Sequence, residues 1–143
     1  MAEFAADSIL RIVIADDSED ARNAIKSMLA EFVEADIFEA STGNECLQIL
    51  ETGRFHALFV NLIMPGQDGF AVLRAISEGA VARPRFVAAV SGWSEVGGIR
   101  LAAEAYEPDA IIGKPFTLDD LQSIISQLAG SVVDDELLDS LMN

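Results

Sequence analysis

Five polar side chains each stand at the end of a short apolar run in the sequence: Asp16, Asp17, Asn61, Ser91 and Lys114. Two carboxylates and a carboxamide oxygen are hard donors of the kind that Mg²⁺ prefers, and Mg²⁺ readily takes a phosphate oxygen as a further ligand. A serine hydroxyl and a lysine ammonium donate hydrogen bonds to phosphoryl oxygens, and the lysine adds positive charge. If the fold brings these side chains together, they predict a pocket for Mg²⁺ and a phosphoryl group.

Each of these residues by itself also has an ordinary structural explanation. An acidic pair after a strand commonly starts a helix, and an asparagine at the inner end of a strand commonly forms a turn. A lysine before a proline is seldom functional, although this chain has only two lysines, Lys26 and Lys114. The functional interpretation therefore depends on the joint spacing of all five residues at successive strand ends.

The apolar pattern predicts five buried strands that alternate with five helices. The strands are expected at 9–16, 36–40, 56–61, 86–91 and 109–113. The helices are expected after Ser18, over 43–52, over 70–77, up to about Tyr106, and from a capping box at Thr117 to Gly130. Such alternation through short loops predicts a doubly wound parallel sheet. In the strand order 2-1-3-4-5, the polar strand ends surround one crevice.

The composition restricts the class of protein. With 143 residues, of which 51% are hydrophobic, the chain can bury the core of one globular domain. Its formal charge of −15 repels nucleic acid and anionic lipid, which argues against direct DNA binding. No apolar run approaches the ~18 residues of a membrane span, so no membrane insertion is expected. Cys46 is the only cysteine, so no internal disulfide can form and a cytoplasmic location is expected.

Five motifs form a highly specific set: IADDSEDAR, EASTGNECL, NLIMPGQDGF, VSGW and IIGKPF. On these motifs the chain resembles the receiver domain of two-component response regulators, from about Leu10 to Ala129. The resemblance implies an α/β fold of the flavodoxin-like (βα)₅ type, with a receiver domain over residues 9–130. It leaves residues 131–143 as an acidic C-terminal tail or short helix.

The resemblance also implies roles for the residues at the strand ends. Asp16 and Asp17 match the acidic pair that holds Mg²⁺, Ser91 matches the switch hydroxyl, and Lys114 matches the phosphate-sensing lysine. Asn61 stands at the phosphoacceptor position. The peptide bond after Lys114 is expected to be cis, as is typical of the family.

Two positions depart from the family's pattern. Asn61 replaces the phosphoacceptor aspartate, and a carboxamide has no anionic oxygen to attack phosphorus. Ile111, three residues before Lys114, replaces the usual aromatic residue and cannot make its in-or-out ring flip. Trp93 is a candidate gate in its place, with an exposed aromatic residue at the rim of the site as the simpler explanation.

These observations predict a stand-alone response regulator that is not an enzyme. With aspartate at position 61 it would accept phosphate from a histidine kinase or histidine phosphotransfer protein and would signal by contact with an output protein. Because the rest of the site is intact, Asn61 is interpreted as an engineered Asp→Asn change rather than a native residue. Two other hypotheses stay open. One is a natural phosphorylation-independent receiver that acts as a constitutive interaction module. The other is a small phosphohydrolase, for which the acidic pair lacks a nucleophile.

The predicted cofactor is Mg²⁺. We expect Asp17, the side-chain oxygen of Asn61 and the carbonyl oxygen of Ile63 to be its ligands, with Asp16 acting through a water molecule. The neutral amide replaces an anionic ligand, so Mg²⁺ should bind more weakly than it does with aspartate at position 61.

Overall fold

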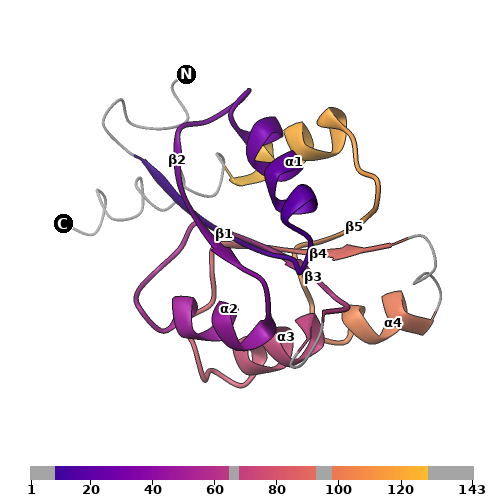
Figure 1. The fold of residues 1–143 in the computed structure, drawn as a ribbon. Coiled ribbons are helices and arrows are strands. Elements are labelled where there is room, and N and C mark those ends of the chain that lie inside the picture. Colours follow the sequence, from indigo (N-terminus) through magenta and orange to yellow (C-terminus); the bar gives the residue numbers. More distant parts are fainter. Residues whose placement is uncertain (1–8, 65–67, 93–97, 129–143) are drawn as a thin grey trace, which may run out of the picture.

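A sheet of five parallel strands forms the centre of the molecule, and helices cover both of its faces (Figure 1). The computed structural model describes residues 9–64, 68–92 and 98–128. Trp93 and the predicted acidic extension over residues 131–143 lie outside these described residues. Within the described part of the chain, no helix is long and apolar enough to cross a membrane.

The strands are β1 (Leu10–Ala15), β2 (Ala35–Ala40), β3 (Ala57–Asn61), β4 (Phe86–Ser91) and β5 (Ala110–Gly113). The helices are α1 (Glu19–Leu29), α2 (Gly43–Leu50), α3 (Gly69–Ser77) and α4 (Gly98–Glu104), and residues 118–128 form a further helix. The predicted alternation of strands and helices is confirmed.

The strands lie in the order β2-β1-β3-β4-β5, and every neighbouring pair is parallel. This order confirms the prediction. The register places Ala15 beside Val60 and Asn61 beside Val90. The carboxyl ends of the three central strands therefore meet at one edge of the sheet.

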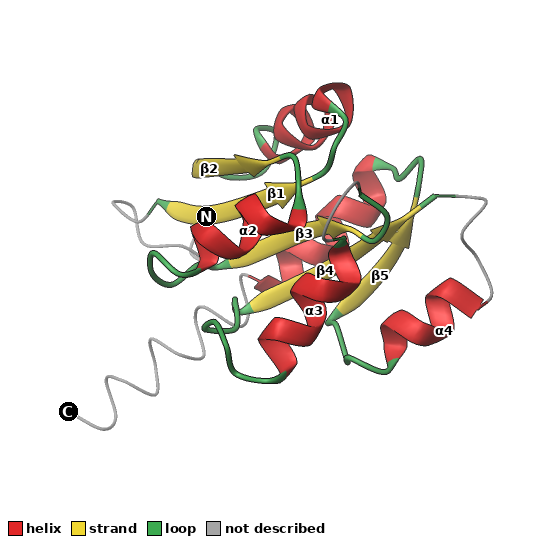
Figure 2. Ribbon diagram, turned by 60° about the horizontal axis from the view of Figure 1, so that its bottom comes forward, coloured by secondary structure: helices red, strands yellow, loops and turns green. Residues whose placement is uncertain are grey.

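Two apolar cores lie on opposite faces of the sheet, because successive side chains of a strand point to opposite faces. In β1, Ile12 and Ile14 pack into the core beneath α1 and helix 118–128, whereas Val13 packs into the core of the other face. The second core is formed with α2 and α3, which lie across the sheet from α1 (Figures 1 and 2). Helices on both faces explain why the central strands are almost entirely apolar.

Side-chain caps determine where the helices begin. Ser18 Oγ accepts a hydrogen bond from the backbone N–H of Ala21 at 3.1 Å, and Asp68 caps α3 in the same way. At the last helix, Thr117 N–H donates to Asp120 Oδ2 at 2.9 Å, and Asp120 N–H donates to Thr117 Oγ1 at 3.2 Å. The predicted cap at Ser18 and the predicted capping box at Thr117 are therefore confirmed.

The only histidine, His56, links the starts of β1 and β3 at the amino edge of the sheet. The backbone N–H of Arg11 donates to His56 Nδ1 at 3.0 Å, and the backbone N–H of His56 donates to the Arg11 carbonyl at 2.8 Å. A protonated Nδ1 cannot accept a hydrogen bond. Burial lowers the pKa of His56, and the charges of Arg85 and Arg11 lower it further.

This environment predicts a pH-dependent stability. Because the folded-state pKa of His56 lies below its unfolded value of about 6.5, the unfolded chain binds the proton more readily. The contribution is fully present above about pH 6.5 and is lost as the pH falls through the folded-state pKa. We expect the urea midpoint, followed by circular dichroism, to decrease between pH 7.5 and 5.5. In His56→Asn the side-chain oxygen can accept the same bond without titrating, so this part of the decrease should disappear. An unchanged decrease in the variant would assign it to other groups.

Candidate functional site

The predicted site residues converge at the carboxyl edge of the sheet. Asp16 follows β1, Asn61 ends β3 and Ser91 ends β4. Their exposed fractions are only 1%, 5% and 4%, although all three are polar. Buried polar side chains need hydrogen-bond partners, so the contacts of each residue show how the site is stabilised.

Asp16 is held by the lysine that follows β5. Lys114 Nζ lies 2.8 Å from Asp16 Oδ2, and the side chains are 30% and 2% exposed. The other carboxylate oxygen, Oδ1, accepts the backbone N–H of Ser18 at 2.9 Å. The Lys114–Pro115 bond is cis, as predicted. Backbone pairing also fixes the lysine, since its N–H donates to the Ser91 carbonyl at 2.7 Å.

Asn61 contacts the two other groups that were predicted to bind a metal directly, Asp17 and the Ile63 carbonyl. Its amide nitrogen Nδ2 donates to the Ile63 carbonyl at 2.9 Å and makes a longer hydrogen bond to Asp17 Oδ1 at 3.4 Å. Asp17 itself is exposed. The side chain of Asn61 therefore bridges the acidic loop after β1 and the loop after β3.

Ser91 lies at the same edge of the sheet, at the end of β4. Its hydroxyl donates to the neighbouring Gly92 carbonyl at 3.3 Å. Its own carbonyl accepts the Lys114 N–H described above. Ser91 therefore fixes the β4–β5 backbone here, and its predicted role as a switch hydroxyl stays a prediction.

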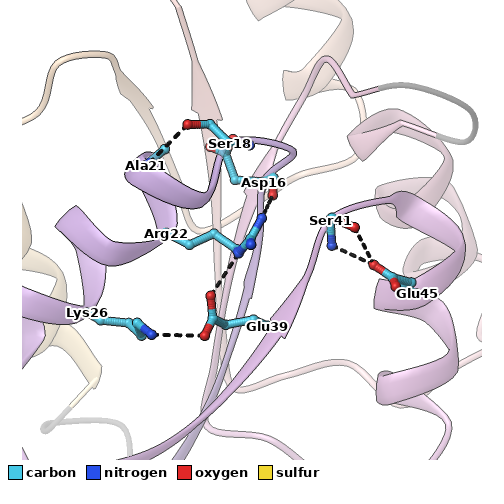
Figure 3. A network of polar contacts seen from close by, with 8 residues as sticks. All are labelled: Asp16, Ser18, Ala21, Arg22, Lys26, Glu39, Ser41 and Glu45. Atoms are coloured by element: carbon cyan, nitrogen blue, oxygen red, sulfur yellow. Dashed lines mark hydrogen bonds and ion pairs between the residues drawn. The ribbon is translucent and has the colours of Figure 1, made fainter.

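A network of charged residues anchors the acidic loop from outside the pocket (Figure 3). Arg22 Nη1 on α1 donates to the backbone carbonyl of Asp16 at 2.6 Å. Arg22 Nε and Lys26 Nζ both contact the carboxylate of Glu39 on β2, at 2.8 and 2.9 Å. These contacts lower the pKa of Glu39, with the hydrogen bond from Lys26 as the largest cause. The sequence analysis missed this network, although a base six residues after Asp16 in so acidic a chain was a usable signal.

The start of α3 packs directly against the backbone of the phosphoacceptor position. A Cβ atom at Gly69 would lie 2.3 Å from the Asn61 carbonyl oxygen and 2.8 Å from Leu62 Cα. The Gly69 N–H donates to the Leu62 carbonyl at 3.0 Å. Only glycine allows this approach. The sequence placed Gly69 in a turn-rich segment but did not reveal this contact.

The side-chain amide of Asn61 is oriented differently from the way the predicted Mg²⁺ site requires, and that site stays a prediction. The predicted ligand was the Asn61 oxygen, but the amide nitrogen faces Asp17 and the Ile63 carbonyl instead. An N–H group cannot coordinate a cation.

Neither Ile111 nor the cysteine provides an additional reactive group. Ile111 is half-buried and packs against the core on the α2–α3 face. Cys46 is fully buried, and burial raises the pKa of its thiol to about 12. A thiol with so high a pKa is a poor nucleophile at neutral pH.

Residues 12–126 match the family described as the response regulator receiver domain. The chain belongs to this family. Receiver domains of known structure have the same fold. A CheY-like receiver domain from Methanospirillum hungatei superimposes with a TM-score of 0.71 at 25% identity, covering 87% of this chain and 97% of that one. The flavodoxin-like order of the strands is therefore that of the family.

Two curated relatives differ in how much of their length this chain spans. The chain is 29% identical over 119 residues to the chemotaxis protein CheY of Pseudomonas aeruginosa, covering 83% of this chain and 95% of that protein. It is 27% identical over 122 residues to the transcriptional regulatory protein CiaR of Streptococcus pneumoniae. That alignment covers 84% of this chain but spans only 51% of CiaR.

The contact at Gly69 predicts that adding a methyl group destabilises the fold much more at this glycine than at Gly98. In Gly69→Ala the new Cβ meets backbone atoms, which cannot rotate away as a side chain can. We expect a loss of about 1–3 kcal/mol in the free energy of unfolding. Gly98→Ala is the matched control, because nothing lies within 4 Å of its Cβ. It should be neutral or stabilising by about 0.5–1 kcal/mol. Urea unfolding measures both, and equal effects would contradict the close approach.

Proposed function

We propose that this receiver, with aspartate at position 61, accepts a phosphoryl group from a histidine kinase or histidine phosphotransfer protein. The observation that carries the proposal is the location of Asn61. It is buried at the end of β3, its side chain reaches Asp17, and the Asp16–Lys114 ion pair belongs to the same edge of the sheet. A carboxylate at this point could attack phosphorus through one oxygen while the donor histidine nitrogen leaves.

The amide of Asn61 blocks this chemistry because its oxygen carries no negative charge. The form of the protein with Asn61 is then a receiver held without phosphate. An engineered Asp→Asn change accounts for Asn61, since Asp16, Ser91 and Lys114 are all retained. In the phosphorylated Asp form, Ser91 and Lys114 would turn toward the phosphoryl oxygens, and Mg²⁺ would bind beside Asp16 and Asp17.

A second candidate function is a natural receiver that acts as a constitutive interaction module. One observation favours it. Both oxygens of Asp16, together with Asp17 Oδ1 and the Ile63 carbonyl, accept hydrogen bonds from groups of the chain itself. In either case the output would be protein contact, in the cytoplasm, because the charge of −15 opposes DNA binding by these residues.

The surface beside Lys114 suits a protein partner. A groove of about 400 Å³ lies between α1 and the segment after β5. It is lined mainly by apolar side chains, namely Ala21, Ala24, Ile25, Met28, Pro115 and Phe116, together with Lys114. Exposed acids, Asp17 and Glu19, stand at the nearby start of α1. We propose that an apolar and basic helical surface of the phosphodonor docks here, which would bring its histidine to the pocket.

The phosphorylation proposal is tested by restoring the carboxylate. With acetyl phosphate and Mg²⁺, Asn61→Asp should gain the mass of one phosphoryl group in intact-protein mass spectrometry, and the label should be lost in base. The unmodified chain should gain none, because the amide oxygen is not a nucleophile. Asn61→Glu is a useful control, since it has a carboxylate in the wrong place. If Asn61→Asp stays unlabelled, the interaction module becomes the better proposal.

The docking proposal is tested in the Asn61→Asp background with a panel of histidine kinases and phosphotransfer proteins. Ala24→Arg puts a bulky charge into the groove and should slow transfer from a protein donor by roughly tenfold or more. Labelling by acetyl phosphate should be unchanged, because a small donor does not need the groove. Ala30→Arg adds the same charge at the exposed end of α1, outside the groove, and should transfer normally. Equal slowing by both variants would point to charge rather than docking.

A further inference from the structure

Hydrogen bonds within the chain already engage most of the polar groups of the candidate site. Both oxygens of Asp16 have partners, Lys114 Nζ and the Ser18 N–H. Two further acceptors, Asp17 Oδ1 and the Ile63 carbonyl, share one donor group, the amide of Asn61. Asn61 therefore does for these two oxygens what a bound cation would do, because it places partial positive charge between them.

The orientation of this amide follows from its surroundings. Rotation by half a turn about Cβ–Cγ would place Asn61 Oδ1 against the Ile63 carbonyl oxygen at about the present 2.9 Å of the amide nitrogen, and toward the Asp17 carboxylate. Two acceptors cannot satisfy each other, and a buried acceptor without a donor costs about 1–3 kcal/mol. Asn61 itself is 5% exposed, whereas Asp17 and Ile63 are exposed residues. The donor-inward orientation is preferred mainly because it avoids the oxygen–oxygen contact with the Ile63 carbonyl.

A cation has to compete with this arrangement. To reach Asp17 and the Ile63 carbonyl it must displace the amide hydrogens or turn the whole amide. The nearby charges give limited help, because the ammonium of Lys114 already neutralises one of the two carboxylates. An aspartate of nearly the same shape has no hydrogen to donate, so it would leave both acceptors open to the cation.

We propose that Asn61 acts as an internal substitute for the divalent cation, so that its side chain opposes Mg²⁺ binding rather than contributing a ligand. This inference rests on the proposed function only for the choice of Mg²⁺ as the cation. It makes the residue at position 61 the determinant of both phosphate acceptance and metal affinity. The receiver with Asn61 is then stable in its metal-free form over the usual range of Mg²⁺ concentration.

The decisive comparison is between the unmodified chain and Asn61→Ala. The two have the same charge, and the variant lacks both the amide oxygen and the amide hydrogens. If the oxygen is a ligand, removing it weakens Mg²⁺ binding. If the hydrogens compete with the cation, removing them tightens binding, and we expect a gain of about tenfold in affinity by isothermal titration calorimetry. Equal or weaker binding by Asn61→Ala would overturn the proposal. NaCl at matched ionic strength controls for screening of the acidic surface.

A second measurement uses the unmodified chain and does not depend on the folding of the variant. The side-chain amide of Asn61 in ¹⁵N-labelled protein should keep its chemical shifts at the Mg²⁺ concentration that saturates Asn61→Asp. A saturable shift of those signals in the same range would overturn the proposal. Its outcome is separate from that of the phosphorylation test. Failure of Asn61→Asp to accept phosphate would remove the receiver function, but the comparison of alanine with asparagine would stand.

Discussion

The buried carboxylate of Asp16 is the constraint around which this receiver is arranged. An ionised side chain that is 1% exposed must be compensated, and breaking a buried ion pair by removing one partner typically costs about 3–5 kcal/mol. Lys114 supplies the compensation from 98 residues away along the chain. The ion pair thus joins the loop after the first strand to the loop after the last one.

Further contacts hold the backbone of the two loops that carry Asp16 and Asn61. Arg22 holds the carbonyl of Asp16, and Glu39 holds Arg22 from the neighbouring strand. On the other side, Gly69 allows α3 to touch the carbonyl of Asn61. The two loops that carry the pocket are therefore fixed by groups outside it. Neither contact involves the side chain of residue 61, so a substitution there leaves both contacts available.

Much of this arrangement could be predicted from the sequence, and the reason is that it follows from short-range patterns. Apolar runs of five to eight residues predicted the strands, and Ser18 and Thr117 predicted the helix starts, because these signals act within a few residues. The convergence of Asp16, Asn61 and Lys114 then followed from the parallel topology.

Contacts between distant residues could not be read in this way. The sequence pattern does not say whether Lys114 pairs with Asp16 or with Asp17. Both acids follow β1, and in the structure they differ in burial. It does not reveal that Arg22 and Glu39 meet, since they belong to different elements. The orientation of the Asn61 amide could not be predicted for the same reason. A carboxamide offers both an acceptor and a donor, and only its neighbours decide which one faces the pocket.

That double character explains why one residue can separate two functions on a single fold. Aspartate and asparagine occupy nearly the same volume, so the close contacts around position 61 accept either one. They differ in charge and in hydrogens, and both differences act in the same direction. The carboxylate can attack phosphorus and leaves Asp17 and the Ile63 carbonyl without a donor, so it favours a cation there. The amide cannot attack and satisfies both acceptors itself. In this structure Asp16 is paired with Lys114 whatever the amide of Asn61 does. On the function proposed above, the choice between a phosphate-accepting and a phosphate-independent receiver therefore lies with the side chain at the end of β3.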